Sequence, residues 1–396
     1  MASDLGFVVR STVGIVIAVS LFGLANGGVF ALIATRLPTA GDNESLIGVL
    51  SSAYFGGTLI TSIFGGWIVS RLGHFKAFFL FAALAGGATF VLSQTAPGWL
   101  WLPPRFITGL GMGGYYVVVE SWFHFAATNK NRGRSLAYYE TVRLASVASG
   151  SLVFLNLGTF GGIDTLTIAG ALYLSAIMAV FTNRRDAPQP GRSERPKFRM
   201  LFLRAPLGAW CCLAGGMANS TLYSMVPAHG AAIGLTASAL SVIVFANHFS
   251  AVAFQLPLGA ISDRFGRMPV ILFMGVSLAI AGGATAIIQP VHIFPLVVTG
   301  FFVGGISHSL FTAGMVHTND RLDRRTMVHG AAAMLVLHDI GTTIGPLLAA
   351  QSMIAGGPYG LYWFFAILGL VTSGSVLSVL WRSACTETAP CCEKRT

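Results

Sequence analysis

The sequence predicts an all-α membrane protein with twelve transmembrane helices in two pseudo-symmetric six-helix bundles. Hydrophobic residues make up 54% of the 396 positions and charged residues only 10%, whereas ordinary globular domains carry about 25% charged residues. Apolar stretches near the roughly 20 residues that a helix needs to cross a bilayer recur along the whole chain. Two sequence patterns also recur at nearly the same interval, which predicts two related halves.

Each expected helix is an apolar segment between short polar loops. The expected spans are 11–34, 46–69, 77–95, 99–124, 135–158, 163–182, 204–228, 235–262, 268–288, 292–318, 327–350 and 358–381. The first is too long for the apolar core of a cleaved signal peptide, so we expect it to be retained.

The expected domain organisation follows from these spans. It comprises an N-terminal bundle over 1–183, a cytoplasmic linker over 184–203, a C-terminal bundle over 204–382 and a cytoplasmic tail over 383–396. The linker combines prolines with closely spaced arginines, a composition that favours partial disorder.

The basic residues predict the orientation. The chain has 24 Lys and Arg residues, and all but Arg36, Arg105 and Arg143 fall in the termini or in the alternate loops on the same side. Because Lys and Arg accumulate on the cytoplasmic side, both termini are expected in the cytoplasm and the protein in the cytoplasmic (inner) membrane. The net charge of +10 therefore reflects topology, and no nucleic-acid partner is expected.

The five cysteines predict no cofactor, metal site or disulfide framework. They occur as two adjacent pairs and one single residue, without CxxC spacing. The roles of the tail cysteines are left open. The cysteines are Cys211, Cys212, Cys385, Cys391 and Cys392.

Two internal repeats relate the halves. The stretch after the second helix recurs 193 positions later, as Gly66-Trp-Ile-Val-Ser70-Arg71-Leu-Gly73-His74 and Gly259-Ala-Ile-Ser-Asp263-Arg264-Phe-Gly266-Arg267. A second pattern recurs with an offset of 191, as Thr108-Gly109 with Gly113-Gly114 and Thr299-Gly300 with Gly304-Gly305. Parallel repeats with a binding site between them near the bilayer midplane are a transporter architecture.

The first repeat resembles the loop signature of the major facilitator superfamily. Its second copy is complete, whereas the first copy has Ser70 at the acidic position and His74 at the later basic position. The resemblance implies gating, in which an Asp–Arg pair bridges helix ends in one conformation and glycines allow close helix approach. The alternative is a static basic loop with tight packing. The signature residues are Gly66, Arg71, Gly73, Gly259, Asp263, Arg264, Gly266 and Arg267.

Further motifs bear on coupling and on the branch of the superfamily. Arg105 opens a segment that resembles the R-x-x-x-G-x-G-x-G pattern of proton-coupled members, which implies that Arg105 faces the cavity. The G-x-x-x-G-P pattern of proton-coupled antiporters occurs on helix 11, as Gly341 to Pro346, and not on helix 5, which argues against the drug antiporters. The stretches Glu120-Ser121-Trp122 and Asn131-Arg132-Gly133-Arg134 resemble the bacterial YcaD-like branch, which implies an exporter of uncertain substrate.

Ionisable and polar side chains inside the expected helices are the candidate functional residues. Placing a charged side chain in hydrocarbon costs at least about 2.5–3.5 kcal/mol, so each such residue is a functional candidate. Expected helices 3, 9 and 12 contain no Asp, Glu, Lys, Arg or His residue, and expected helix 6 contains one, Asp164, as its second residue, which fits the superfamily's outer scaffold. The proton-coupling candidates are Asp339, Glu120, Glu140, His308 and His338. The substrate-binding candidates are Arg105, Arg143, Asn26, Asn219, Tyr223, Asn247 and His248.

Each candidate also has a structural alternative. Glu140 and Arg143 are one helical turn apart and could form a purely structural ion pair. Arg105 could reach water from the periplasmic mouth, and a lone histidine or amide could simply hydrogen-bond a neighbouring helix. Asp339 is the strongest proton candidate, with a partner expected from His308 or His248 because His338 is not expected to share its face.

These observations predict a secondary active transporter that works by alternating access. We expect it to move a small organic solute, to be coupled to protons, to act as an exporter and to be monomeric in the lipid bilayer. An importer or uniporter of a sugar, organic anion or metal chelate remains an alternative. An intramembrane enzyme is disfavoured because the sequence has no HExxH or GxSxG motif, and a channel because it needs a continuous lined pore.

Overall fold

The structure is a computed structural model that describes residues 2–39, 44–126, 132–157, 159–160, 162–181 and 198–388. These residues form helices joined by short turns and one small hairpin. The helices are α1 (Ala2–Thr39), α2 (Glu44–Leu72), α3 (His74–Gln94), the 3-10 turn η1 (Trp99–Trp101), α4 (Leu102–Ala126), α5 (Arg132–Leu157), α6 (Thr165–Phe181), α7 (Phe198–Arg204), α8 (Pro206–Ala232), α9 (Ala237–Phe265), α10 (Arg267–Ile288), α11 (Ile293–Asn319), α12 (Arg324–Gly356) and α13 (Gly360–Thr388). Strands β1 (Thr159–Phe160) and β2 (Ile163–Asp164) pair antiparallel.

The described helices include several that can cross a membrane. Eight are long and apolar enough to do so, and α7 with α8 would make a ninth span although the two meet at a bend of 114°. The apolar helix α6 is shorter. The chain is therefore a multi-pass membrane protein, and the full set of twelve spans stays a prediction.

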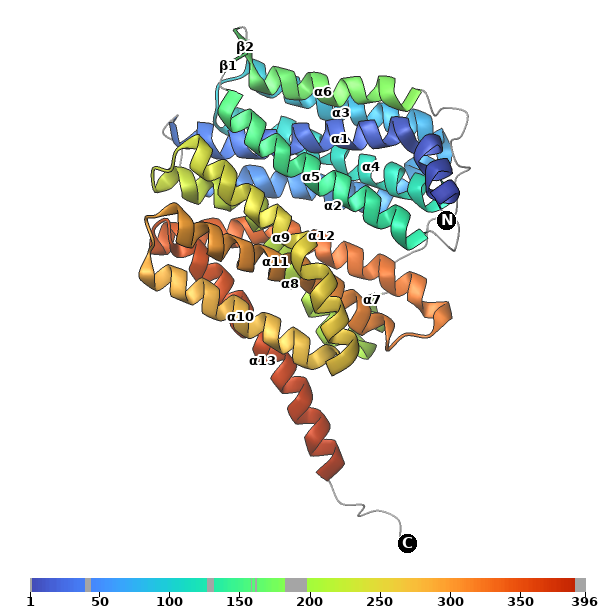
Figure 1. The fold of residues 1–396 in the computed structure, drawn as a ribbon, viewed down its shortest axis with the longest axis vertical. Helices are drawn as coiled ribbons and strands as arrows, with labels where there is room; N and C mark the ends of the chain where they lie inside the picture. The colour runs from blue at the N-terminus through green and yellow to red at the C-terminus, as the bar shows by residue number, and fades with distance from the viewer. Residues whose placement is uncertain are drawn as a thin grey trace.

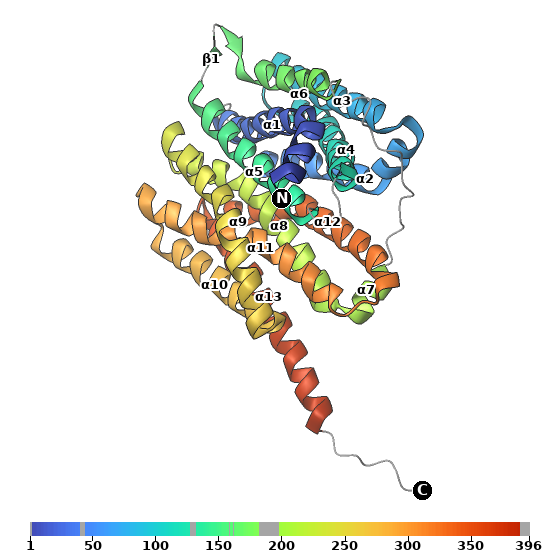
Figure 2. The ribbon, with the colours of Figure 1, turned by 45° about the vertical axis from the view of Figure 1, so that its right-hand side comes forward.

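The helices gather in two groups that follow the order of the chain (Figure 1). In the first half α1 packs on α5 and α6, while α4 packs on α2 and α3. In the second half α8 packs on α11 and α12, α9 on α11, and α10 on α13. Figure 2 shows the same separation after a turn of 45°. The domain bounds within this arrangement stay predictions.

The internal repeat is also a repeat of packing. Gly27 of α1 lies against the backbone of Val147 on α5, and Gly216 of α8 lies against the backbone of His338 on α12. The two glycines are offset by 189 positions and their partners by 191. A Cβ atom at either glycine would collide with the facing backbone, so each half uses glycine for the same close helix approach.

The two groups touch through α2 and α12, α5 and α9, and α1 and α8. At the end that carries the β-hairpin, the side-chain amide of Asn156 on α5 bridges two hydroxyls of α9. Asn156 Nδ2 donates to Ser241 Oγ at 3.0 Å, and Ser238 Oγ donates to Asn156 Oδ1 at 3.0 Å. We call this contact the amide latch. It joins the two halves at the hairpin end.

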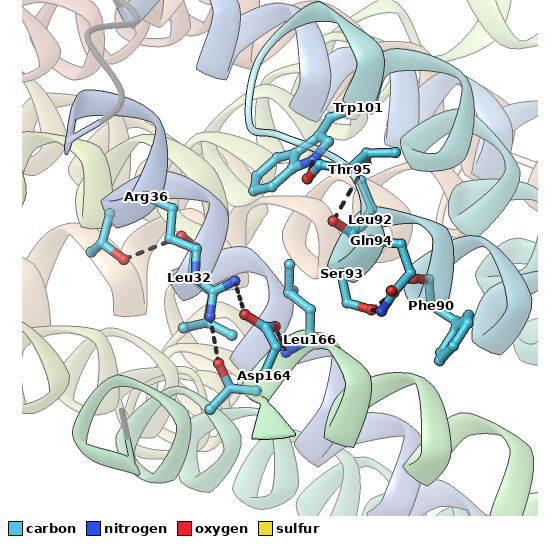
Figure 3. Close-up of polar contacts among 12 residues, drawn as sticks. Leu32, Arg36, Phe90, Leu92, Ser93, Gln94, Thr95, Trp101, Asp164 and Leu166 are labelled. Carbon is cyan, nitrogen blue, oxygen red and sulfur yellow. Dashed lines mark hydrogen bonds and ion pairs between the residues drawn. The ribbon is translucent and has the colours of Figure 1, made fainter. Parts of the chain in front are cut away.

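The hairpin explains the position of Arg36, the basic residue expected on the opposite side from the others. Arg36 Nη1 donates to Asp164 Oδ2 at 2.8 Å and its Nη2 to Thr165 Oγ1 at 2.7 Å (Figure 3). Asp164 Oδ1 in turn accepts from the backbone N–H of Leu166 at 2.7 Å and so caps α6. The charge of Arg36 is thus paired within its own half.

A short helix lies at the end of the expected linker over 184–203. Residues 182–197 lie outside the described part of the chain, but its last residues form α7. Leu201 is fully buried against Ala333 and Met334 of α12, which anchors this short helix. Helix α13 also runs into the expected tail over 383–396, whereas Cys391 and Cys392 lie outside the described residues.

Candidate functional site

A polar cluster lies where the two halves meet, and it begins with an ion pair on α5. Arg143 Nε donates to Glu140 Oε2 at 2.8 Å, and Arg143 Nη2 contacts Glu140 Oε1. The guanidinium carbon of Arg143 is 5.8 Å from the ring centroid of Tyr116 on α4. It also interacts electrostatically with Tyr223 on α8, in the other half. The expected pairing of Glu140 with Arg143 is therefore present.

The second half contributes aromatic and histidine rings to the same cluster. The Tyr223 ring centroid lies 4.6 Å from that of His248 on α9 and 6.3 Å from that of His308 on α11. The two histidine rings are 6.3 Å apart. His248 is buried and its Nδ1 bonds the Val244 carbonyl at 2.7 Å, so Nδ1 carries the proton. His248 Nε2 is then an acceptor, and it has no partner among the described residues.

Asp339 has a nearer partner than expected. His338 Nδ1 lies 3.4 Å from Asp339 Oδ1, and the His338 ring packs on Phe311 with centroids 4.6 Å apart. The expectation that His338 would turn away from Asp339, leaving the pairing to His308 or His248, was wrong. Consecutive helical residues diverge at Cβ, but two flexible side chains can still bend toward each other.

Glu120 lies on α4 within electrostatic range of Glu140, Arg143 and Asp339. Its side chain is exposed, whereas the carboxylate of Glu140 is the one that holds Arg143. Three acidic candidates from three helices therefore converge on one region, although they were chosen from separate parts of the sequence.

Arg105 occupies a different place, on the first turn of α4. It is 0% exposed, so the alternative in which it reaches water is wrong. Its guanidinium carbon lies 4.6 Å from the ring centroids of both Phe30 and Tyr54. We call Arg105 with these two rings the arginine cage.

The three candidate amides differ in their surroundings. Asn26 Oδ1 accepts from Tyr54 Oη at 3.0 Å and from Tyr173 Oη at 3.4 Å, which fits interhelical hydrogen bonding beside the arginine cage. Asn247 is buried next to Gly300, and neither polar atom of its amide has a partner among the described residues. The Oδ1 atom of Asn219 is also buried without such a partner.

The second copy of the loop signature forms a network of charges. Arg267 donates from Nη1 to Asp263 Oδ1 at 2.5 Å and from Nε to Asp320 Oδ2 at 2.9 Å. Gly266 has φ +90, a value that favours glycine. Arg264 packs near the Phe265 ring instead of joining the network.

The first copy replaces that network with a neutral contact. His74 Nε2 lies 2.9 Å from Ser121 Oγ, and its ring is 6.0 Å from that of Trp122. Ser121 and Trp122 belong to the stretch that resembled the YcaD-like branch. His74, which departs from the superfamily's loop signature, therefore contacts the residues that carry the resemblance to that branch. Arg71 stacks over Trp67 at 4.7 Å, and Gly73 has φ +77.

The sequence predicted that the signature glycines allow close helix approach, and this prediction is wrong for Gly259. A Cβ atom there would meet nothing within 4 Å. On α2 the close contact falls at Gly65, where a Cβ atom would lie 3.2 Å from Val117 of α4. Gly259 instead lines a small cavity of about 140 Å³ beside Gln255 and Thr312.

Comparison with known proteins identifies the family. The sequence profile of the Major Facilitator Superfamily matches residues 15–336 and 215–389. The chain belongs to this superfamily. It is 27% identical over 317 residues to the uncharacterized MFS-type transporter YcaD of Escherichia coli O45:K1 (strain S88 / ExPEC), an alignment that covers 78% of this chain and 79% of that protein. Both the superfamily and the YcaD-like resemblance predicted from the sequence are confirmed.

Solved structures of the superfamily share the fold. The nucleoside transporter NupG matches with a TM-score of 0.74 and 13% identity, covering 93% of this chain and 99% of that chain. A bacterial homologue of the human lysosomal transporter Spinster, in an inward-facing and unoccupied conformation, matches with a TM-score of 0.72 and 13% identity, covering 94% and 96%. The superfamily membership makes this chain a relative of transporters.

Sequence reasoning missed the aromatic residues that complete both sites. Tyr116 faces Arg143, while Phe30, Tyr54 and Tyr173 surround Arg105 or its neighbours. One signal was available, because Tyr54 lies 193 positions before the candidate Asn247. In this superfamily member the two residues pack against the equivalent glycines Gly109 and Gly300.

Proposed function

We propose that this chain is a secondary active transporter that exports a small organic solute across the cytoplasmic membrane in exchange for protons. In this proposal twelve helices form two six-helix bundles, both termini are cytoplasmic, and the monomer works by alternating access. The solute and protons are its partners, together with the surrounding lipid.

The polar cluster is the observation that carries the proposal. Arg143 with Glu140 comes from the first half, and Tyr223, His248 and His308 come from the second. A site built from both halves changes its geometry whenever the halves move relative to each other, so a bound solute can bias that movement. A purely structural ion pair would not need an acceptor beside it such as His248 Nε2, which has no partner in the part of the chain that the structure describes.

Proton coupling is supported by the gathering of carboxylates around one guanidinium. Glu120 lies within electrostatic range of the Glu140–Arg143 pair on one side and of Asp339 on the other. Protonation of one carboxylate changes which partner Arg143 prefers, because a neutral carboxyl group no longer attracts the guanidinium. In our proposal the solute and the proton compete for this region, which gives exchange.

The proposed conformation opens toward the cytoplasm. The amide latch and the contact of Gly48 with Pro346 hold the halves together at the hairpin end. The basic loops predict that this end faces outward. The Spinster homologue of similar fold is described as inward-facing, and this likeness supports the same assignment here.

The test begins with a thermal-shift screen of the purified protein against sugars, carboxylates, siderophores, metals and drugs. Transport of the stabilising compounds is then measured in proteoliposomes with an imposed pH gradient and a pH-sensitive dye inside. We expect solute movement that saturates, shows counterflow and dissipates the pH gradient. Saturable movement without any change in internal pH would contradict proton coupling, and a chemically altered product would indicate an enzyme.

Carboxylate variants test the residue assignments. Asp339→Asn and Glu140→Gln should each abolish pH-driven transport while leaving solute counterflow measurable, because counterflow needs no net proton movement. Glu44→Gln, on the first turn of α2, is the matched control and should behave as wild type. If Asp339→Asn leaves pH-driven transport intact, its assignment to proton coupling is wrong. The direction of the gradient that drives accumulation distinguishes the exporter from an importer or uniporter.

A further inference from the structure

Arg105 is a buried charge for which the described residues supply no counter-ion. Among the residues whose burial the structure describes, Arg105 is the one Asp, Glu, Lys or Arg residue that is buried. Its Nε, Nη1 and Nη2 atoms are all buried and have no hydrogen-bond partner among the described residues. A guanidinium carries five N–H donors, so none of its donor capacity is used within the described chain.

The two aromatic rings satisfy the faces of this guanidinium and not its edge. Phe30 and Tyr54 both lie 4.6 Å from the guanidinium carbon, measured to the ring centroids. Such distances allow cation–π attraction, which acts perpendicular to the ring plane. The N–H bonds lie in the guanidinium plane and require acceptors there. The hydrogen-bond acceptors that the guanidinium still needs therefore lie in its plane, along its N–H edge.

The neighbouring polar groups are neutral and already committed to one another. The hydroxyls of Tyr54 and Tyr173 lie within electrostatic range of Arg105. Both hydroxyls donate to Asn26 Oδ1. In contrast, Arg143 is neutralised by Glu140. Arg105 therefore differs from Arg143 in that no carboxylate of the described residues neutralises it.

The arginine cage borders the polar cluster. The Phe30 ring centroid is 6.1 Å from that of Tyr223 on α8, and Tyr223 contacts His248 in the cluster. One aromatic ring thus separates Arg105 from the region shared by both halves. A small solute that contacts the histidine side of the cluster can place a charged group near Arg105.

We infer that Arg105 is the subsite for an anionic group of the transported solute, and that this group is a carboxylate. A carboxylate accepts two parallel N–H bonds from the edge of a guanidinium, which matches the unfilled geometry. The inference rests on the proposed transport function and narrows its substrate class to organic acids. The guanidinium edge is shielded here, so the anion reaches it when the two halves separate at the amide latch.

Acetate is the minimal probe of this subsite. The thermal unfolding midpoint of the purified full-length protein is measured in potassium acetate and in potassium chloride of equal ionic strength, with acetamide as the neutral analogue of the same shape. We expect a saturable rise of the midpoint with acetate and none with acetamide. Asn156→Ala opens the latch and should increase the apparent acetate affinity.

Variants at Arg105 decide whether the guanidinium is responsible. Arg105→Met should lose the acetate response, and Arg105→Lys should weaken apparent affinity at least about tenfold because an ammonium cannot present two parallel N–H bonds. Arg204→Met, which removes an exposed pair with Asp323, should keep the full response. No acetate-specific stabilisation in either wild type or Asn156→Ala, or an unchanged response in Arg105→Met, would overturn the inference.

The result for the Arg105 subsite can be distinguished from the result for the transport function. If acetate binds through Arg105 but the reconstituted protein moves no solute, the subsite stands and the proposed transport function fails. If transport is found but its solutes are neutral or cationic and Arg105→Met leaves it unchanged, the transport function stands and the subsite fails.

Discussion

Replacing Arg105 with methionine should make the empty protein more stable. The substitution removes a buried charge whose three nitrogens have no partner among the described residues. It keeps an unbranched side chain of similar reach between Phe30 and Tyr54. Exchanging buried charges for apolar residues of similar volume is often neutral or stabilising, by about 1–4 kcal/mol.

The magnitude follows from two opposing contributions. Each buried donor atom left without an acceptor costs about 1–3 kcal/mol, so three of them cost roughly 3–9 kcal/mol. Loss of two cation–π contacts removes about 0.5–2 kcal/mol each, or roughly 1–4 kcal/mol together. Subtracting the central values, about 2.5 from about 6 kcal/mol, favours methionine by roughly 3–4 kcal/mol.

The assay is thermal unfolding of both proteins in the same detergent, followed by intrinsic fluorescence and without added carboxylate. Arg204→Met is again the matched control, because an exposed ion pair contributes at most about 1 kcal/mol. A midpoint for Arg105→Met below that of the control would refute the reasoning. It would mean that the guanidinium is fully satisfied and that the arginine cage is a structural element.

Two further predictions concern the latch and the loop signature. Asn156→Ala removes two hydrogen bonds between the halves, each worth about 0.5–1.5 kcal/mol, so the closed-to-open equilibrium constant at the hairpin end should fall by roughly 5- to 150-fold. Electron-spin distances between labels on α5 and α9 would report this change, and unchanged distances would contradict it. Gly266→Ala places a side chain at φ +90 and should cost about 1–2 kcal/mol. In contrast, Gly259→Ala should be neutral or slightly stabilising because its Cβ meets nothing within 4 Å. Thermal unfolding of the matched pair measures both effects, and equal losses would show that Gly259 needs the close approach expected from its motif.

The positions of the helices were largely predictable, and their ends were not. Hydrophobic length locates a span, but backbone hydrogen bonding continues into polar residues beyond the apolar stretch. Helix α12 therefore begins at Arg324 and ends at Gly356, whereas the expected span covered 327–350. The hairpin at β1 and β2 was missed because strands of two residues carry no periodic signal.

The candidate residues were predictable by type, but their partners were not. A charge inside an apolar helix is visible in the sequence, which is why Arg143, His248 and His308 were chosen. Which helices face each other is set by packing, so the sequence could not place Tyr223 beside both histidines. The same limit applies to Arg105, whose neighbours come from α1 and α2.

His338 and Val147 occupy the same position in the two halves, each with its backbone against a glycine of the partner helix. Because the contact is made by the main chain, this joint between the helices does not depend on which side chain stands at the position. A duplicated unit can therefore change this residue from aliphatic to titratable without rebuilding the joint between its helices. Ionisable chemistry can then accumulate in one copy while the other keeps an inert residue, and a symmetric scaffold acquires a functionally unequal pair of halves.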